Sequence, residues 1–226
     1  MDSSSRGKGI KALFMKLLRA AGGLMLFGFG LYLTIRADIG LAPWDVLCAA
    51  IAAKLGTSYG NISIAIGIVV FIVDVLLREP IGFGMLLDIF VVGKTVDLLE
   101  LINLVPVAEK PVFSIPLLLA GLTIMAFAMW LYMTAALGCG PRDSLLVGLG
   151  KRLRRLPIGA VQAMILAAVL FSGWLLGGPV GIGTLISVCL QGPITQAVFS
   201  LLRFEPRGLE HESIAASLKH FGTKKT

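Results

Sequence analysis

Residues that hold metals or form disulfide bonds are scarce in this sequence. Of its 226 residues, only two are histidine and three are cysteine. Both histidines, His211 and His220, lie in a polar C-terminal segment. Cys48, Cys139 and Cys189 stand in apolar surroundings without paired spacing, which predicts small buried side chains. The sequence therefore predicts no disulfide framework, no metal site and no cofactor.

Charged residues and catalytic motifs are also scarce. Only 15% of the residues are charged, and the patterns GxGxxG, P-loop, HExxH and GxSxG are all absent. This composition argues against an enzyme. The net charge of +7 does not indicate a nucleic-acid partner, because the cations gather at the termini and in KRLRR at 151–155. Basic loops of this kind are typical of the cytoplasmic side of membrane proteins.

Long hydrophobic runs dominate what is present. Hydrophobic residues make up 57% of the chain, and the mean hydropathy is +0.91. Crossing the hydrocarbon layer takes about 20 apolar residues. Suitable runs occupy residues 20–35, 61–77, 112–136 and 160–177, and two further runs at 82–103 and 181–202 carry polar residues. We expect an all-α polytopic membrane protein surrounded by lipid.

The sequence repeats itself at long range, and residues 24–102 can be aligned with residues 124–202. LYLT at 31–34 matches LYMT at 131–134, and IGLAPWD matches LGCGPRD. The shared glycines and prolines predict a duplication of two four-helix repeats at 16–103 and 112–202. A basic N-terminus at 1–15, a linker at 104–111 and a tail at 203–226 complete the chain. The repeated positions are Gly40, Pro43, Gly82 and Gly84 in the first half, and Gly138, Pro141, Gly181 and Gly183 in the second.

The second helix of each repeat is predicted to be short. It begins at Pro43 or Pro141, because proline suits the first turn of a helix. The segment 43–55 would be about 20 Å long, too short to cross the membrane. We therefore expect six spanning helices and two re-entrant ones, with inverted halves; the alternative is eight spans with parallel halves. Both arrangements place the two termini and residues 151–155 in the cytoplasm of a bacterium, with the chain in the inner membrane.

The repeated phrases contain the first candidate binding residues. Asp45 and Asp143 are each the third residue of a short helix, where a carboxylate can cap the helix start. The same helix ends, if they lie at mid-membrane, can bind a solute. Arg142 stands where the first half has Trp44, so it could bind an anionic group, pair with Asp143 or reach the membrane interface. Trp44 is the residue type of an interfacial anchor.

Polar residues of the 82–103 and 181–202 helices correspond between the halves. Asp88 aligns with Ser187, and Asp97 aligns with Gln196, which indicates that these positions face the interior. Lys94 can neutralise Asp97 at i,i+3 spacing. Asp88 has no opposite charge at helical spacing and is the first candidate for a proton or cation site, with Asp97 and Lys94 as further members.

A second ion pair is predicted at the end of the 61–77 run, where Asp74 and Arg78 are at i,i+4 spacing. Charges paired in this way are typical of structural contacts.

The phrases GLAPWDVL and GCGPRDSLLVGL, followed by PIGFG and PVGIG, resemble those of the bacterial YczE/YitT-type integral membrane proteins, with the YczE branch the nearer. The resemblance covers about residues 15–203. It implies a multi-pass membrane topology and a suspected transport role, and it transfers no catalytic residue. Cys48 stands where the resemblance leads one to expect a histidine.

Two functions remain open from the sequence. The first is a transporter or exporter of a small solute, with a site between the repeats framed by Asp45, Arg142 and Asp143. The alternative is an accessory protein that scaffolds a partner and uses its polar residues for packing. A cavity that reaches Asp88 and both Pro-x-Asp turns would favour the transporter, and a filled interior would favour the accessory protein.

Overall fold

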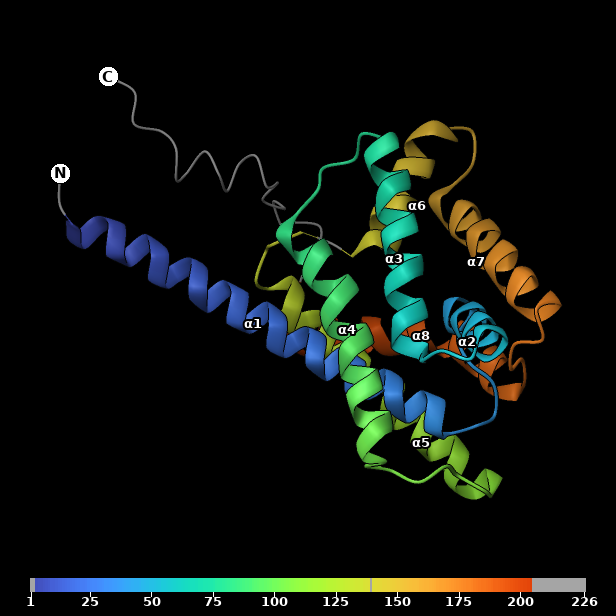
Figure 1. The fold of residues 1–226 in the computed structure, drawn as a ribbon. Coiled ribbons are helices and arrows are strands. Elements are labelled where there is room, and N and C mark those ends of the chain that lie inside the picture. The colour runs from blue at the N-terminus through green and yellow to red at the C-terminus, as the bar shows by residue number, and fades with distance from the viewer. Residues whose placement is uncertain (1–2, 139, 205–226) are drawn as a thin grey trace.

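The computed structural model describes residues 3–138 and 140–204, and these form eight helices without a strand (Figure 1). Residues 205–226 of the predicted tail, which include both histidines, lie outside the described residues, as does Cys139. The all-helical fold class is therefore confirmed for the part of the chain described. In order, the helices are α1 (Ser3–Arg36), α2 (Pro43–Leu55), α3 (Tyr59–Leu76), α4 (Phe83–Ile102), α5 (Pro111–Met133), α6 (Pro141–Arg152), α7 (Ile158–Leu175) and α8 (Ile182–Leu201).

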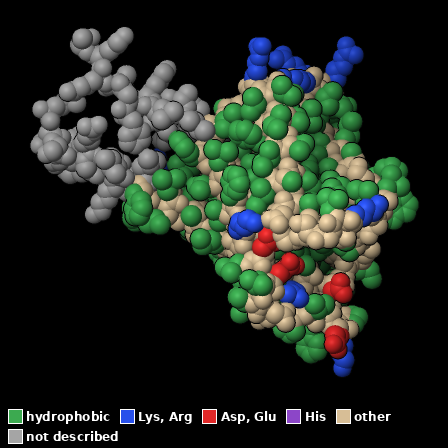
Figure 2. Space-filling model, in the orientation of Figure 1, with side chains coloured by type: hydrophobic (Ala, Val, Ile, Leu, Met, Phe, Trp, Pro, Cys, Tyr) green, Lys and Arg blue, Asp and Glu red, His purple; other side chains and the backbone are tan. Residues whose placement is uncertain are grey.

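Within the described residues, five helices are long and apolar enough to cross a membrane. They are α1 from Phe14 onward, α3, α5, α7 and α8. α4 has 20 residues, but Asp88, Lys94, Asp97 and Glu100 lower its hydropathy. Figure 2 shows the outcome: a broad band of hydrophobic side chains covers the middle of the molecule, and a group of Lys and Arg side chains lies at its upper end.

The short helices begin and end where the local chemistry requires. Proline is the first residue of both α2 and α6, as predicted. α2 ends at Gly56, whose left-handed backbone (φ 61°, ψ 35°) is the common glycine cap of a helix. With 13 and 12 residues, α2 and α6 are each under 20 Å long at about 1.5 Å per residue.

α1 and α5 run in opposite directions and are in contact at a glycine of each helix. The guanidinium of Arg19, in the first half of α1, lies 5.9 Å from the ring centre of Trp130 near the end of α5. At the middle of the crossing, Gly30 and Gly121 face each other so closely that a Cβ on either would come within 2.8 Å of the other's carbonyl oxygen. Backbones can approach in this way only where side chains are absent. The antiparallel pairing is visible in Figure 1.

The two glycine-containing turns that precede α2 and α6 are each hydrogen-bonded to the other half of the chain. Gly183 N–H donates a hydrogen bond of 2.6 Å to the carbonyl of Ile39, and Gly84 N–H donates one of 2.8 Å to the carbonyl of Leu137. Gly40 (φ 106°) and Gly138 (φ 111°) adopt the same positive-φ conformation in these turns. These glycines therefore allow tight turns and close backbone contacts between the two halves.

Other left-handed residues also occur in matching places. In the predicted alignment of the two halves, two pairs occupy corresponding positions: Asp38 (50°) with Ala136 (56°), and Arg78 (56°) with Gly177 (83°). Residues other than glycine rarely adopt positive φ, so these positions are unusual, and both pairs lie just after a helix.

Candidate functional site

A cavity of about 1140 Å³ lies between the two halves of the chain. Its walls include the starts of both short helices, with Pro43 and Pro141 among the lining residues. Five predicted site residues line this one cavity: Trp44, Asp45, Asp88, Arg142 and Asp143. Residues up to 99 positions apart in the sequence therefore line the same cavity. The hydrogen-bonded glycine turns bring the starts of α2 and α6 together.

Asp45 is the most enclosed of these side chains. Its residue is 4% exposed, and its Oδ1 accepts a hydrogen bond of 2.7 Å from the hydroxyl of Tyr59 on α3. The same oxygen lies 3.5 Å from Nη1 of Arg142. Asp45 was predicted to cap the start of its own helix, but its carboxylate contacts α3 and α6 instead. Both are contacts between helices, which the spacing along the sequence does not reveal.

Arg142 joins the two repeated phrases. Besides its ion pair with Asp45, its guanidinium lies 5.1 Å from the centre of the Trp44 ring, within the range of a cation–π contact. The side chain keeps 34% of its surface accessible, and it lines the cavity. Arg142, which has no charged counterpart in the first half, therefore contacts Trp44 and Asp45 of the first half at the cavity wall.

Asp88 on α4 meets the start of α6. A Cβ on Gly140, the residue that precedes α6, would lie 3.0 Å from Oδ2 of Asp88. A carboxylate at this place faces the positive end of the α6 dipole. Ser187 and Gln196, which the repeat aligns with Asp88 and Asp97, also line the cavity. The prediction that these positions face the interior is confirmed for Asp88, Ser187 and Gln196.

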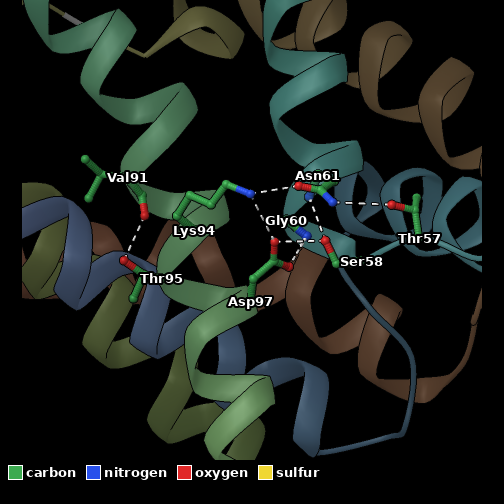
Figure 3. A network of polar contacts seen from close by, with 8 residues as sticks. All are labelled: Thr57, Ser58, Gly60, Asn61, Val91, Lys94, Thr95 and Asp97. Carbon is green, nitrogen blue, oxygen red and sulfur yellow. Dashed lines mark hydrogen bonds and ion pairs between the residues drawn. The ribbon is translucent and has the colours of Figure 1, made fainter.

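Lys94 and Asp97 have a different place, at the start of α3 (Figure 3). Their predicted ion pair is present at 3.7 Å. Asp97 also accepts hydrogen bonds from the backbone N–H of Gly60 (2.7 Å) and the hydroxyl of Ser58 (2.8 Å), while Lys94 donates to Asn61 (2.8 Å). Neither residue is among those that line the cavity. The structure thus separates them from Asp88 and places them in the packing of α4 on α3.

Two predictions about individual side chains are wrong. Asp74 and Arg78 do not share a helical turn, because α3 ends at Leu76 and Arg78 has a positive φ of 56°. Both carboxylate oxygens of Asp74 are buried without a hydrogen-bond partner. Cys189 on α8 is exposed, because it lies on an outer face, whereas Cys48 is buried as predicted.

The end of α6 is held by the turn between α3 and α4. Lys151 Nζ pairs with the buried carboxylate of Glu79, and Arg152 Nη2 donates a hydrogen bond of 2.9 Å to the carbonyl of Leu77. α6 is thereby fixed at both ends, with Arg142 and Asp143 at the cavity and the basic residues near the surface.

Polar residues of α7 and α8 complete the cavity and were not predicted individually. They are Gln162 on α7 and Gln191 and Thr195 on α8. A glutamine within the apolar run IGAVQAMILAAVL is the signal that could have revealed the first. Among the residues described, no three His, Cys, Asp or Glu side chains come together as a metal site.

Most of the chain is similar to known proteins. A family model described as "Family of unknown function (DUF6198)" matches residues 14–200. The chain belongs to this family. An uncharacterized protein of Haemophilus influenzae is 33% identical over 181 residues, covering 79% of this chain and 81% of the relative. No solved structure matches the chain significantly.

Two relatives come from Bacillus subtilis. The uncharacterized membrane protein YczE is 30% identical over 79% of this chain and 82% of its own length, and the uncharacterized protein YyaS is 28% identical over 79% and 89%. The resemblance to the YczE-type family is thus confirmed. Together with the five apolar helices, these relatives identify the DUF6198 chain as an integral membrane protein.

Proposed function

We propose that this protein transports a small solute across the bacterial inner membrane, through the cavity between its two halves. The observation that carries the proposal is the cavity itself, which reaches Asp88 and the Pro-x-Asp starts of both short helices. An accessory protein that uses its polar residues only for packing has no need of such a space. A void of about 1140 Å³ is larger than the usual range of small-molecule pockets and is ample for a metabolite.

The internal duplication is part of the proposal. The matched hydrogen bonds at Ile39 and Leu137, and the matched positive-φ positions, support two copies of one four-helix unit. The antiparallel crossing of α1 and α5 supports inverted halves. If α2 and α6 do not cross, α1, α3 and α4 bring the chain to the opposite side before α5 begins. Six spans with two re-entrant helices therefore agree with the crossing, whereas eight spans would make α1 and α5 parallel.

The orientation in the membrane follows from charge. Residues 151–155 form the end of α6 and the beginning of the α6–α7 loop, at the upper end of Figure 1, where Figure 2 shows Lys and Arg side chains gathered. Positive loops remain in the cytoplasm. We therefore assign this end to the cytoplasm and the α1–α2 and α4–α5 loops to the outside, and with six spans both chain termini are cytoplasmic.

Solute flux in cells tests the proposal. Accumulation and release of a panel of small metabolites would be compared among the wild type, Asp45→Asn, Arg142→Gln and Asp143→Asn at equal amounts in the membrane. The matched control is Glu109→Gln, an exposed carboxylate in the α4–α5 loop. We expect at least one solute whose flux falls tenfold or more in the cavity variants and stays at the wild-type level in the control. Equal flux in all variants, for every solute that moves, would contradict the proposal.

A further inference from the structure

Asp74 is a buried carboxyl group without a partner, and it lies outside the cavity described above. It stands in the last turn of α3 and is 0% exposed, and neither of its carboxylate oxygens has a hydrogen-bond partner. The negative end of the α3 dipole lies at this turn and disfavours a further negative charge. An ionised carboxylate in such a place is so costly that it takes up a proton or a metal cation instead.

A second carboxylate, Glu79, makes an ionised Asp74 still less favourable. The backbone N–H of Glu79 donates a hydrogen bond of 3.0 Å to the carbonyl of Asp74, and Glu79 is 7% exposed. The charge of Glu79 acts on Asp74 and would repel a second negative charge. Lys151 of α6 pairs with Glu79. The cation at this turn therefore compensates Glu79, and the Asp74 carboxyl is left without a counter-charge.

The other cations around this turn do not supply one. Arg152 of α6 donates hydrogen bonds to the carbonyls of Leu77 (2.9 Å) and Gly148 (3.1 Å), and Arg78 is exposed. α3 packs on α2, α4 and α6. The remaining charged residues of these three helices are Asp45, Lys54, Asp88, Lys94, Asp97, Glu100, Arg142 and Asp143. Among the described residues, none of these charged groups bonds to either oxygen of Asp74.

The donor set around Asp74 favours a proton over a metal ion. Hard cations such as calcium and magnesium are surrounded by about six or more oxygen ligands. Among the described residues, no three His, Cys, Asp or Glu side chains come together, and Asp74 has no polar neighbour at hydrogen-bond distance. A proton needs only one carboxylate oxygen, and it removes the buried charge completely.

The second half of the chain has a glycine at the corresponding position. The alignment of the halves places Gly173 of α7 opposite Asp74, and a Cβ on Gly173 would lie 2.8 Å from the backbone nitrogen of Leu47 on α2. α7 packs on α2 as α3 packs on α6. The helix that carries an ionisable group in the first half therefore carries, at the same place in the second half, a glycine closed tightly against a backbone.

We propose that Asp74 is a proton-binding site, which takes its proton from water on the side that we assign to the cytoplasm. The neutral carboxyl group keeps the last turn of α3 packed on α6 (Figure 1). When the proton returns to water, a buried unpaired carboxylate is left, and α6 has to move before water can reach it. Since α6 carries Arg142 and Asp143 at the cavity, the proton controls the cavity. This last step rests on the proposed function, whereas the proton site does not.

Infrared spectroscopy of the full chain in nanodiscs tests the site without any solute. Exposed carboxyl groups are ionised at neutral pH, so a carboxylic-acid C=O band that shifts in heavy water reports a buried protonated group. We expect this band in the wild type, a loss equal to one carboxyl group in Asp74→Asn, and full intensity in Glu109→Gln, which changes an exposed carboxylate. No acid band in the wild type, or an undiminished band in Asp74→Asn, would overturn the proposal.

The wild type alone also separates a proton from a metal ion. We expect the acid band to have the same intensity in protein kept with excess sodium and calcium and in protein treated with a chelator. A band that grows only after chelation would show that a metal ion occupies the carboxylate, and this would overturn the proposal too. The comparison remains decisive even if Asp74→Asn does not fold.

Flux at different cytoplasmic pH tests the control of the cavity. In inside-out membrane vesicles, the pH of the medium would be raised by about two units around neutrality, which removes the proton from Asp74. We expect the flux of a solute that the wild type moves to change at least fivefold. Asp74→Asn, which stays neutral, should change less than twofold, and Glu109→Gln should follow the wild type. An equal pH response in Asp74→Asn and the wild type would overturn this control.

The two proposals can fail separately. If no cavity variant alters the flux of any solute, the transport proposal is wrong, and the infrared band still decides whether Asp74 holds a proton. If cavity variants alter flux but the acid band does not depend on Asp74, transport stands and the proton site is wrong.

Discussion

The ion pair between Asp45 and Arg142 is one of the contacts that join the two halves at the cavity, and its strength can be predicted and measured. At an effective dielectric of about 20, two unit charges 3.5 Å apart attract each other by roughly 5 kcal/mol. Arg142 keeps 34% of its side chain accessible, and solvent in the cavity screens the pair. We therefore expect a coupling free energy of about 1–3 kcal/mol, between the values for surface and buried pairs.

A double-mutant cycle measures this coupling. Arg142→Gln should lower the free energy of unfolding by about 3 kcal/mol, because it leaves the buried carboxylate with Tyr59 as its remaining contact. Asp45→Asn should cost less, since an amide oxygen can still accept the hydrogen bond from Tyr59. With both changes together, the loss should be about 1–3 kcal/mol smaller than the sum of the single losses.

The assay is equilibrium unfolding of the purified protein in mixed micelles with increasing dodecyl sulfate, followed by circular dichroism. The control cycle is Lys94→Met with Asp97→Asn, because Lys94 is 62% exposed and a pair of this kind couples by about 1 kcal/mol or less. If the losses in unfolding free energy of the two single variants, Asp45→Asn and Arg142→Gln, add up to that of the double variant within about 0.5 kcal/mol, the ion pair does not stabilise the contact between the halves.

Three other predictions follow from single contacts. Gly138→Ala should prevent a stable fold, because φ is 111° and the new Cβ would lie 2.9 Å from Cα of Gly82; thermal unfolding of purified protein would detect this. Asp97→Asn alone should lower the free energy of unfolding by about 1–3 kcal/mol, because it weakens charge-assisted hydrogen bonds from Gly60 and Ser58; a loss no larger than that of Lys94→Met would contradict this. Thr57→Cys, in a background without the native cysteines, should react with an impermeant maleimide added outside intact cells; protection there would favour eight spans.

The helix starts could be predicted because their causes are local. Pro43 and Pro141 begin α2 and α6 as expected, since a proline at the first position depends only on its own backbone. The predicted range 43–55 for the first short helix matches the observed one. Helix ends were less predictable: α3 ends at Leu76, and the pairing of Asp74 with Arg78 failed for that reason.

The candidate site could be predicted in its members but not in its contacts. The repeat pointed to Asp45 and Asp143 as equivalent positions and to Arg142 as the counterpart of Trp44, and the missing counter-charge pointed to Asp88. That Tyr59 donates to Asp45, and that Asp88 lies beside Gly140, depends on how helices distant in the sequence pack. For the same reason the Lys94–Asp97 pair was predicted correctly from its spacing, while its hydrogen bonds to the start of α3 were not.

The central claim, that the cavity between the halves is the path of a solute, is tested most directly by filling it. Gly192 on α8 lines the cavity, and a Cβ there would meet nothing within 4 Å, so Gly192→Phe should fold. Gly22 on α1 has the same open surroundings and does not line the cavity, which makes Gly22→Phe the matched control. The measurement is the flux, through membranes with equal amounts of protein, of any solute that the wild type moves. The account predicts loss of at least nine-tenths of the flux in Gly192→Phe and wild-type flux in Gly22→Phe; full flux through Gly192→Phe would contradict it.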